Sequence, residues 1–165
     1  GHRRIALLNL HAPHYGPARM RCAGFEQAHD HAGITLDPDL VVEINQPTYD
    51  NDEWRAAIES LLERPQPPTA IVAFNDEVAL QVYAVCRARG LHIPQDVSVT
   101  GCDDIPASQH IDPPLTTVRI PAREQGRLAM ETLLKRIQGQ DEELSPRTLL
   151  DVELIVRESC TAPNA

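Results

Sequence analysis

The sequence is short of positive charge and contains no long apolar run. Of its 165 residues, 15 are Lys or Arg and 24 are Asp or Glu, which gives a formal net charge of −9 at pH 7. A chain with this charge repels phosphate backbones, so it is a poor nucleic-acid-binding surface by itself. No apolar run approaches the ~20 residues that span a bilayer, and no basic start precedes an apolar stretch. We therefore expect neither a membrane helix nor a visible signal peptide.

The motifs that carry phosphate binding and hydrolysis are also missing. The sequence contains no G-x-G-x-x-G, G-x-x-x-x-G-K-[ST], G-x-S-x-G or H-E-x-x-H segment. A nucleophile would have to be Cys102 or Ser108 with His110 as base, and neither lies in a catalytic signature. A phosphoacceptor domain would need an acidic pair after the first strand, where this chain has Asn9-Leu10-His11. We therefore expect a protein that is not an enzyme.

Cysteine and histidine show no metal-binding pattern. The four cysteines, Cys22, Cys86, Cys102 and Cys160, form no C-x-x-C pair and lie in or beside apolar runs. This indicates free thiols in a reducing compartment rather than disulfides or zinc ligands. The close histidine pairs at positions 11 and 14 and at positions 29 and 31 lack a third ligand at a typical spacing. We expect a cytoplasmic protein with no metal and no cofactor.

Short apolar strands and amphipathic helices alternate along the first two thirds of the chain. The expected strands are 5–10, 41–44, 69–74 and 97–101, and the expected helices are 18–32, one from Asn51 or Asp52 to before Pro65, and 77–89. Gly33 and Gly90 suit the left-handed position that ends a helix. The β-α-β-α-β-α-β order and short connections predict an α/β fold with a doubly wound parallel sheet and right-handed crossovers.

The last third of the chain is less regular. Residues 115–118 are a fifth strand or a linker, and residues 121–138 carry the apolar stripe of a helix. Residues 149–156 alternate apolar and acidic side chains, which predicts a half-exposed strand. The end of the chain, residues 159–165, is expected to be a flexible tail.

Candidate ligand-binding residues follow the strands, because ligands of open parallel sheets bind at the carboxyl ends of the strands. Arg21, Tyr49, Asn75 and Asp103 all belong to these segments. A cation, a carboxylate, an amide and an aromatic ring suit a small polar ligand with hydroxyl groups. Each residue also has a structural interpretation, as an ion pair, packing, or a turn former. Asp76 precedes a helix and is predicted to be its N-cap.

Several segments resemble the effector-binding core of lactose-repressor-type (LacI/GalR) transcription regulators. They are GHRRIALL at 1–8, RCAGF at 21–25, PTAIVAFND at 68–76, GLHIPQDVSVTGCDD at 90–104, PPLTTV at 113–118 and LIVRES at 154–159. The resemblance implies a type I periplasmic-binding-protein fold, with two lobes and an effector in the cleft. It also implies effector contacts for Arg21, Asn75 and Asp103, and a stacking role for Tyr49.

Two positions depart from the pattern of this family. Pro17-Ala18 stands where a serine is frequent, and Ile120 stands where a glutamine is common. Both changes remove polar groups that would face the cleft, which argues against a standard hexose as effector.

By the same resemblance, residues 1–118 are the C-terminal lobe, 119–158 a crossover helix and a returning strand, and 159–165 a tail. The DNA-reading helix-turn-helix, the hinge helix and the first lobe have no counterpart in this sequence. The resemblance implies an effector-sensing domain of a homodimeric regulator, with operator DNA bound through the absent domain and no membrane partner. The alternative is a periplasmic solute-binding protein for sugars.

The helix at 121–138 follows from this assignment as a structural hypothesis. In the intact family fold its apolar stripe packs in the first lobe, so in this chain it needs another cover. We expect it to pack against its own chain in a different position, or against a second copy in a two-fold or swapped association.

Overall fold

The computed structural model describes residues 1–11, 14–44, 52–140 and 147–164. The elements, in chain order, are β1 (Ile5–Leu10), α1 (Gly16–Ala32), β2 (Val41–Ile44), α2 (Asp52–Leu62), β3 (Ala70–Ala73), α3 (Asp76–Arg89), β4 (Ser98–Asp103), β5 (Thr116–Arg119), α4 (Ala122–Ile137) and β6 (Glu153–Ile155). They form one six-stranded sheet in the order β2-β1-β3-β4-β5-β6. The pairs from β2 to β5 are parallel, and β6 is antiparallel to β5. This confirms the predicted α/β class and its parallel sheet.

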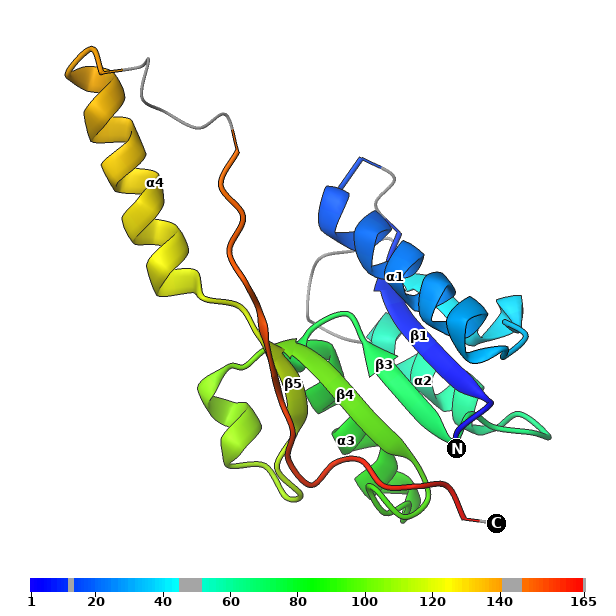
Figure 1. Cartoon of the computed structure of the whole chain (residues 1–165). Helices are drawn as coiled ribbons and strands as arrows, with labels where there is room; N and C mark the ends of the chain where they lie inside the picture. The colour runs from blue at the N-terminus through cyan, green and yellow to red at the C-terminus, as the bar shows by residue number, and fades with distance from the viewer. Residues whose placement is uncertain (12–13, 45–51, 141–146, 165) are drawn as a thin grey trace.

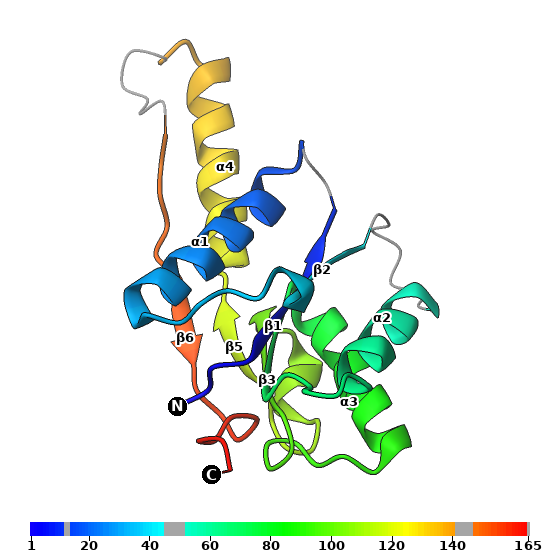
Figure 2. The same ribbon diagram turned by 90° about the vertical axis from the view of Figure 1, so that its right-hand side faces the viewer.

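The helices cover the two faces of the sheet unequally. Helix α1 lies on one face, and α2 and α3 lie on the other (Figures 1 and 2). Trp54 and Ile58 of α2 and Val78 and Val82 of α3 are all at most 1% exposed, whereas α1 buries only Ala18, Phe25 and His29. The main core therefore lies between the sheet and α2 and α3. Each large apolar side chain buried there contributes about 1.5–3 kcal/mol.

The helix ends follow the predicted chemistry with one exception. Gly33 and Gly90 end α1 and α3 with φ of 62° and 69°, the left-handed conformation that glycine adopts at low cost. Asn75, not Asp76, caps α3, because its side chain accepts a hydrogen bond from the Val78 N–H at 3.0 Å. The prediction of Asp76 as the cap was wrong, since that carboxylate is fully buried and binds groups outside its helix.

Residues 116–119 form the fifth strand, and the chain then leaves the body of the fold. Helix α4 and the segment that returns from it project away from the sheet (Figure 1). Helix α4 has no buried residue, and its stripe of Met130, Leu133, Leu134 and Ile137 is 43–72% exposed. The returning strand is shorter than expected and spans only Glu153–Ile155. Within the described residues the stripe does not pack against its own chain, so that alternative was wrong, and a cover by a second copy stays a prediction.

The expected tail is attached to the sheet at its start. Ser159 is fully buried, and its carbonyl accepts a hydrogen bond from Val99 N at 2.9 Å. Its hydroxyl accepts a second hydrogen bond, from Thr116 N, at 2.8 Å. Two residues further on, Thr161 N donates to Ser98 Oγ at 3.1 Å. Residues 159–161 are therefore hydrogen-bonded to the first residues of β4 and β5.

Candidate functional site

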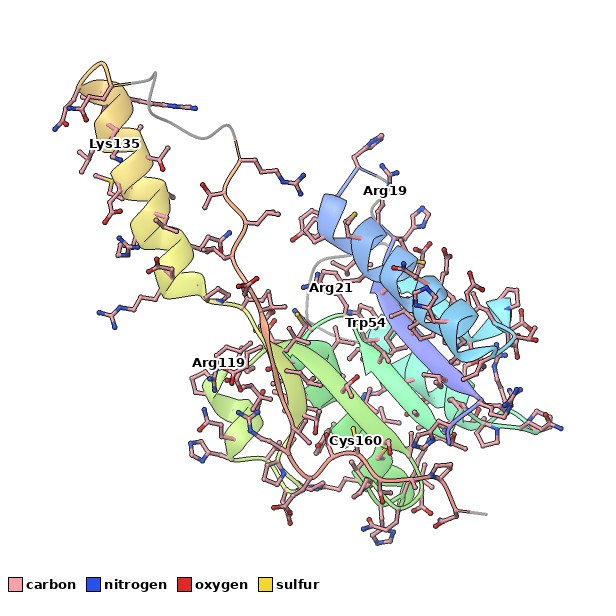
Figure 3. The ribbon with its side chains drawn as sticks, viewed as in Figure 1. Arg19, Arg21, Trp54, Arg119, Lys135 and Cys160 are labelled. Carbon is pink, nitrogen blue, oxygen red and sulfur yellow. The ribbon has the colours of Figure 1, made fainter. Side chains whose placement is uncertain are left out.

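Arg21 and Asp103 meet at the carboxyl ends of the strands. Asp103 is the last residue of β4, and Arg21 lies in the second turn of α1, the helix that follows β1. Arg21 Nη2 lies 4.0 Å from Asp103 Oδ1 and 3.3 Å from Cys102 Sγ. Figure 3 shows Arg21 on the side of α1 that faces the ends of β3 and β4. Two groups that are 82 positions apart in sequence thus form one charged pair, as the strand-end argument predicts.

The segment that follows Asp103 is hydrogen-bonded to the buried carboxylate of Asp76. Its oxygen Oδ2 accepts hydrogen bonds from Ser108 Oγ at 2.6 Å and from Ile105 N at 2.9 Å. Its other oxygen accepts a hydrogen bond from the Thr117 hydroxyl. One carboxylate at the start of α3 therefore holds both the segment after β4 and the next strand, β5.

Gly101 permits this arrangement, because a Cβ at that position would lie 2.3 Å from Asp76 Oδ1 and 3.2 Å from Asp76 Cα. Beyond the glycine, Asp103 and Asp104 both adopt positive φ, 114° and 53°. Such angles are uncommon for residues other than glycine and require support from their surroundings. The Asp76 hydrogen bonds to Ile105 and Ser108 hold the segment that follows, so this turn is supported by residues outside its own strand.

Asn75 lies at the same edge of the sheet, two residues past the end of β3, and is 5% exposed. Its side-chain oxygen is engaged in the cap of α3. It adjoins the charged pair through its neighbour Phe74, whose ring lies 4.2 Å from the guanidinium carbon of Arg21. The structure thus brings together three of the four predicted residues, and the fourth, Tyr49, lies outside the described residues.

Burial shapes the electrostatics of the pair. Burial raises the pKa of Asp103, and the guanidinium of Arg21 opposes that rise. Burial also raises the pKa of the Cys102 thiol, again against the effect of Arg21. Arg21 offers several N–H donors and Asp103 offers acceptor oxygens. A polar molecule with both acceptor and donor groups would find partners on the two side chains.

Two aromatic residues beside the site, Tyr15 and Phe74, were not among the residues predicted from the sequence. The Tyr15 ring lies 6.4 Å from the Phe74 ring at an interplanar angle of 49°, and Tyr15 is 49% exposed. Phe74 could have been found from its place directly before Asn75 at a strand end. Tyr15 precedes α1 and has no comparable signal, because its position beside Phe74 depends on how α1 crosses the sheet.

The catalytic alternative gains no support from the geometry. Ser108 is fully buried, and its hydroxyl donates to Asp76 rather than to His110. Among the residues that the structure describes, no three His, Cys, Asp or Glu side chains are grouped so that they could hold a metal ion. No helix in that part of the chain is long and apolar enough to cross a membrane.

Comparisons with known proteins bear on the family and the fold of this chain. The family model for periplasmic-binding-protein-like domains matches residues 1–160. The transcriptional repressor CytR of Escherichia coli K12 is 37% identical over 98% of this chain. Among solved structures, a complex of the transcriptional regulator CelR with cellobiose superposes with a TM-score of 0.84 at 36% identity, over 96% of this chain and 47% of that one. A regulatory protein of the LacI family from Chloroflexus aggregans gives 0.85 at 33% identity, over 98% of this chain and 56% of that one. The chain spans 46% of the length of CytR, so it corresponds to about half of such a relative.

Proposed function

The chain belongs to the family of periplasmic-binding-protein-like domains, among those of LacI-type regulators, and from this we propose that it is the C-terminal part of an effector-sensing domain. The observation that carries the proposal is the Arg21–Asp103 pair at the carboxyl edge of the sheet. In this proposal Asn75 and Tyr49 are further effector contacts. The chain has no catalytic role and works in the cytoplasm.

The proposed effector is a small polar metabolite, sugar-like in its hydroxyl groups. Arg21 donates to an acceptor oxygen of the effector, and Asp103 accepts from a hydroxyl or N–H group. Tyr15 and Phe74 provide ring surface beside these groups, which favours a ligand with a ring face. Pro17 and Ile120 lack hydrogen-bonding side chains, so the number of hydroxyl contacts is smaller than in a fully polar cleft.

The remainder of a protein of the relatives' length supplies the other wall of the cleft and the DNA-reading part. An effector that touches both walls favours one relative orientation of the two lobes. It thereby shifts the population of the DNA-competent homodimer. The alternative, a periplasmic solute-binding protein, shares the fold but is less favoured, because the matched relatives are transcriptional repressors.

The experiment measures effector binding to the longer protein by thermal shift, with a panel of sugars, nucleosides and amino acids that includes cellobiose. For a ligand that binds, Asp103→Ala should weaken binding at least about tenfold, because a hydrogen bond to a charged group contributes roughly 1.5–3 kcal/mol. Asp30→Ala serves as the matched control, since Asp30 is exposed near the far end of α1. An unchanged titration with Asp103→Ala would remove Asp103 from the site.

A further inference from the structure

The carboxylate of Asp104, the residue next to Asp103, is bound by two arginines. The side chain of Asp104 is only 4% exposed. Its Oδ1 accepts a hydrogen bond from Arg157 Nη2 at 2.5 Å, and its Oδ2 accepts one from Arg119 Nε at 2.8 Å. Burial alone would raise the pKa of Asp104, but the two arginines outweigh it and hold the pKa below its usual range. The group is therefore a charged, bound carboxylate rather than a surface acid.

The two arginines come from the two ends of the segment that leaves the fold. Arg119 is the last residue of β5, immediately before the chain departs toward α4. Arg157 lies two residues past β6, where the chain has returned. Arg157 also donates to the Leu115 carbonyl at 2.7 Å, and its own N–H donates to Thr116 Oγ1 at 2.9 Å. Asp104 thus connects the outgoing and the returning segment at their common base.

The same carboxylate is covalently next to Asp103. Both residues have positive φ, so the turn is a short, unusual piece of backbone rather than a continuing strand. Asp103 faces Arg21 across the sheet edge, and Asp104 faces Arg119 and Arg157. A single peptide therefore joins the residue that faces Arg21 to the residue that binds Arg119 and Arg157.

We propose that Asp104 is a positioning residue that couples the Asp103 turn to the base of the α4 segment. A change in the charge that faces Asp103 then alters the pairing of β5 with β6 and the direction in which the α4 segment leaves the lobe. That the change comes from a bound effector rests on the proposed function. The coupling itself rests on the hydrogen bonds around Asp104.

The test needs no ligand and uses the 165-residue chain. Arg21→Met removes the cation that faces Asp103 and stands in for a change at the ligand side. Hydrogen exchange of the amides at 153–158, measured by mass spectrometry, should change at least twofold in this variant. In the Asp104→Asn background the same Arg21→Met substitution should leave exchange at 153–158 unchanged. Loss of stability alone would not abolish the response to a second substitution in this way.

Glu153→Gln is the matched control, because it removes only the exposed partner of Arg119 and should leave the response to Arg21→Met intact. If Asp104→Asn does not fold, Arg119→Gln removes one of the two arginines from a position that is 47% exposed, and should reduce the response. No response in the parent chain, or an equal response with and without Asp104, would overturn the coupling. A ligand screen without a binder would instead contradict the proposed function, and would leave the exchange result standing.

Discussion

At the scale of single residues, the edge of the sheet around Asp103 depends on two other carboxylates with buried side chains, those of Asp76 and Asp104. Asp76 accepts three hydrogen bonds below the sheet edge, and Asp104 accepts two from arginines. Buried acceptors of this kind are costly to remove, because their donors are left without partners. The two carboxylates therefore fix the turn from which Asp103 points toward Arg21.

Asp76→Ala should lower the free energy of unfolding by about 3–5 kcal/mol, because it leaves the Ser108 and Thr117 hydroxyls and the Ile105 N–H without their acceptor. Urea unfolding followed by circular dichroism measures this loss. Glu77→Ala, at the exposed neighbouring position, should change it by no more than about 0.5 kcal/mol. Similar losses for the two variants would show that the Asp76 network does not stabilise the fold.

The proximity of Arg21 and Asp103 could be predicted from sequence, because parallel strands end at one edge and both residues follow or end such strands. The role of Asp76 could not. Its partners Ser108 and Thr117 are 32 and 41 residues away, and only the folded sheet brings them together. A local rule therefore assigned the cap to Asp76, whereas Asn75 next to it holds the position.

At the scale of elements, α4 differs from the other long helices in having no buried residue among the described residues. Helices α1, α2 and α3 could be predicted in type and nearly in length, because their apolar stripes match a sheet face of the same chain. The existence of α4 could be predicted in the same way. Its surroundings could not, since the periodicity of a stripe does not say which surface covers it.

Leu133→Glu should change the free energy of unfolding of the monomeric chain by at most about 0.5 kcal/mol, because Leu133 is 50% exposed there. In the longer protein, where we expect the first lobe to cover the stripe, the same change should cost at least about 2 kcal/mol. Denaturant unfolding of both proteins measures the difference. Lys135→Glu, on the opposite side of α4, is the control and should have little effect in either protein.

Light scattering tests the other possibility, that a second copy of this chain covers the apolar stripe of α4. A species above 18.3 kDa that Leu133→Glu converts to monomer would show that two chains cover each other through α4. Equal effects of Leu133→Glu on the stability of the short and the long protein would contradict cover by the first lobe.

At the scale of the whole molecule, the acidic charge of this chain and its half-length match both favour a DNA-binding surface outside this chain. The chain carries nine more acidic than basic groups and spans 46% of the repressor CytR. Contacts with DNA phosphates require an excess of Lys and Arg on the contacting surface. In the proposed protein such a surface belongs to the part outside this chain.

The 165-residue chain should therefore show no shift of duplex DNA at about 0.15 M salt, where exposed charges are screened within about 8 Å. The longer protein should bind its operator, with an affinity that falls linearly on a log–log plot against salt concentration. Gel-shift titrations at several salt concentrations provide the measurement. Salt-dependent DNA binding by the short chain would contradict this prediction, because it would show that residues of this chain contact DNA.

The antiparallel pairing of β5 with β6 makes the α4 segment an insertion that could be cut out. Arg119 and Glu153 are register partners, so the two ends of the insertion lie side by side. Two directly opposed residues can be joined by a two-residue Asn-Gly hairpin. Replacing residues 120–152 by such a turn would shorten the closed loop by roughly four halvings, which favours folding by about 2 kcal/mol at ~0.6 kcal/mol each. The segment between β5 and β6 can in this sense be lengthened, exchanged or removed without a change in the order of the sheet strands.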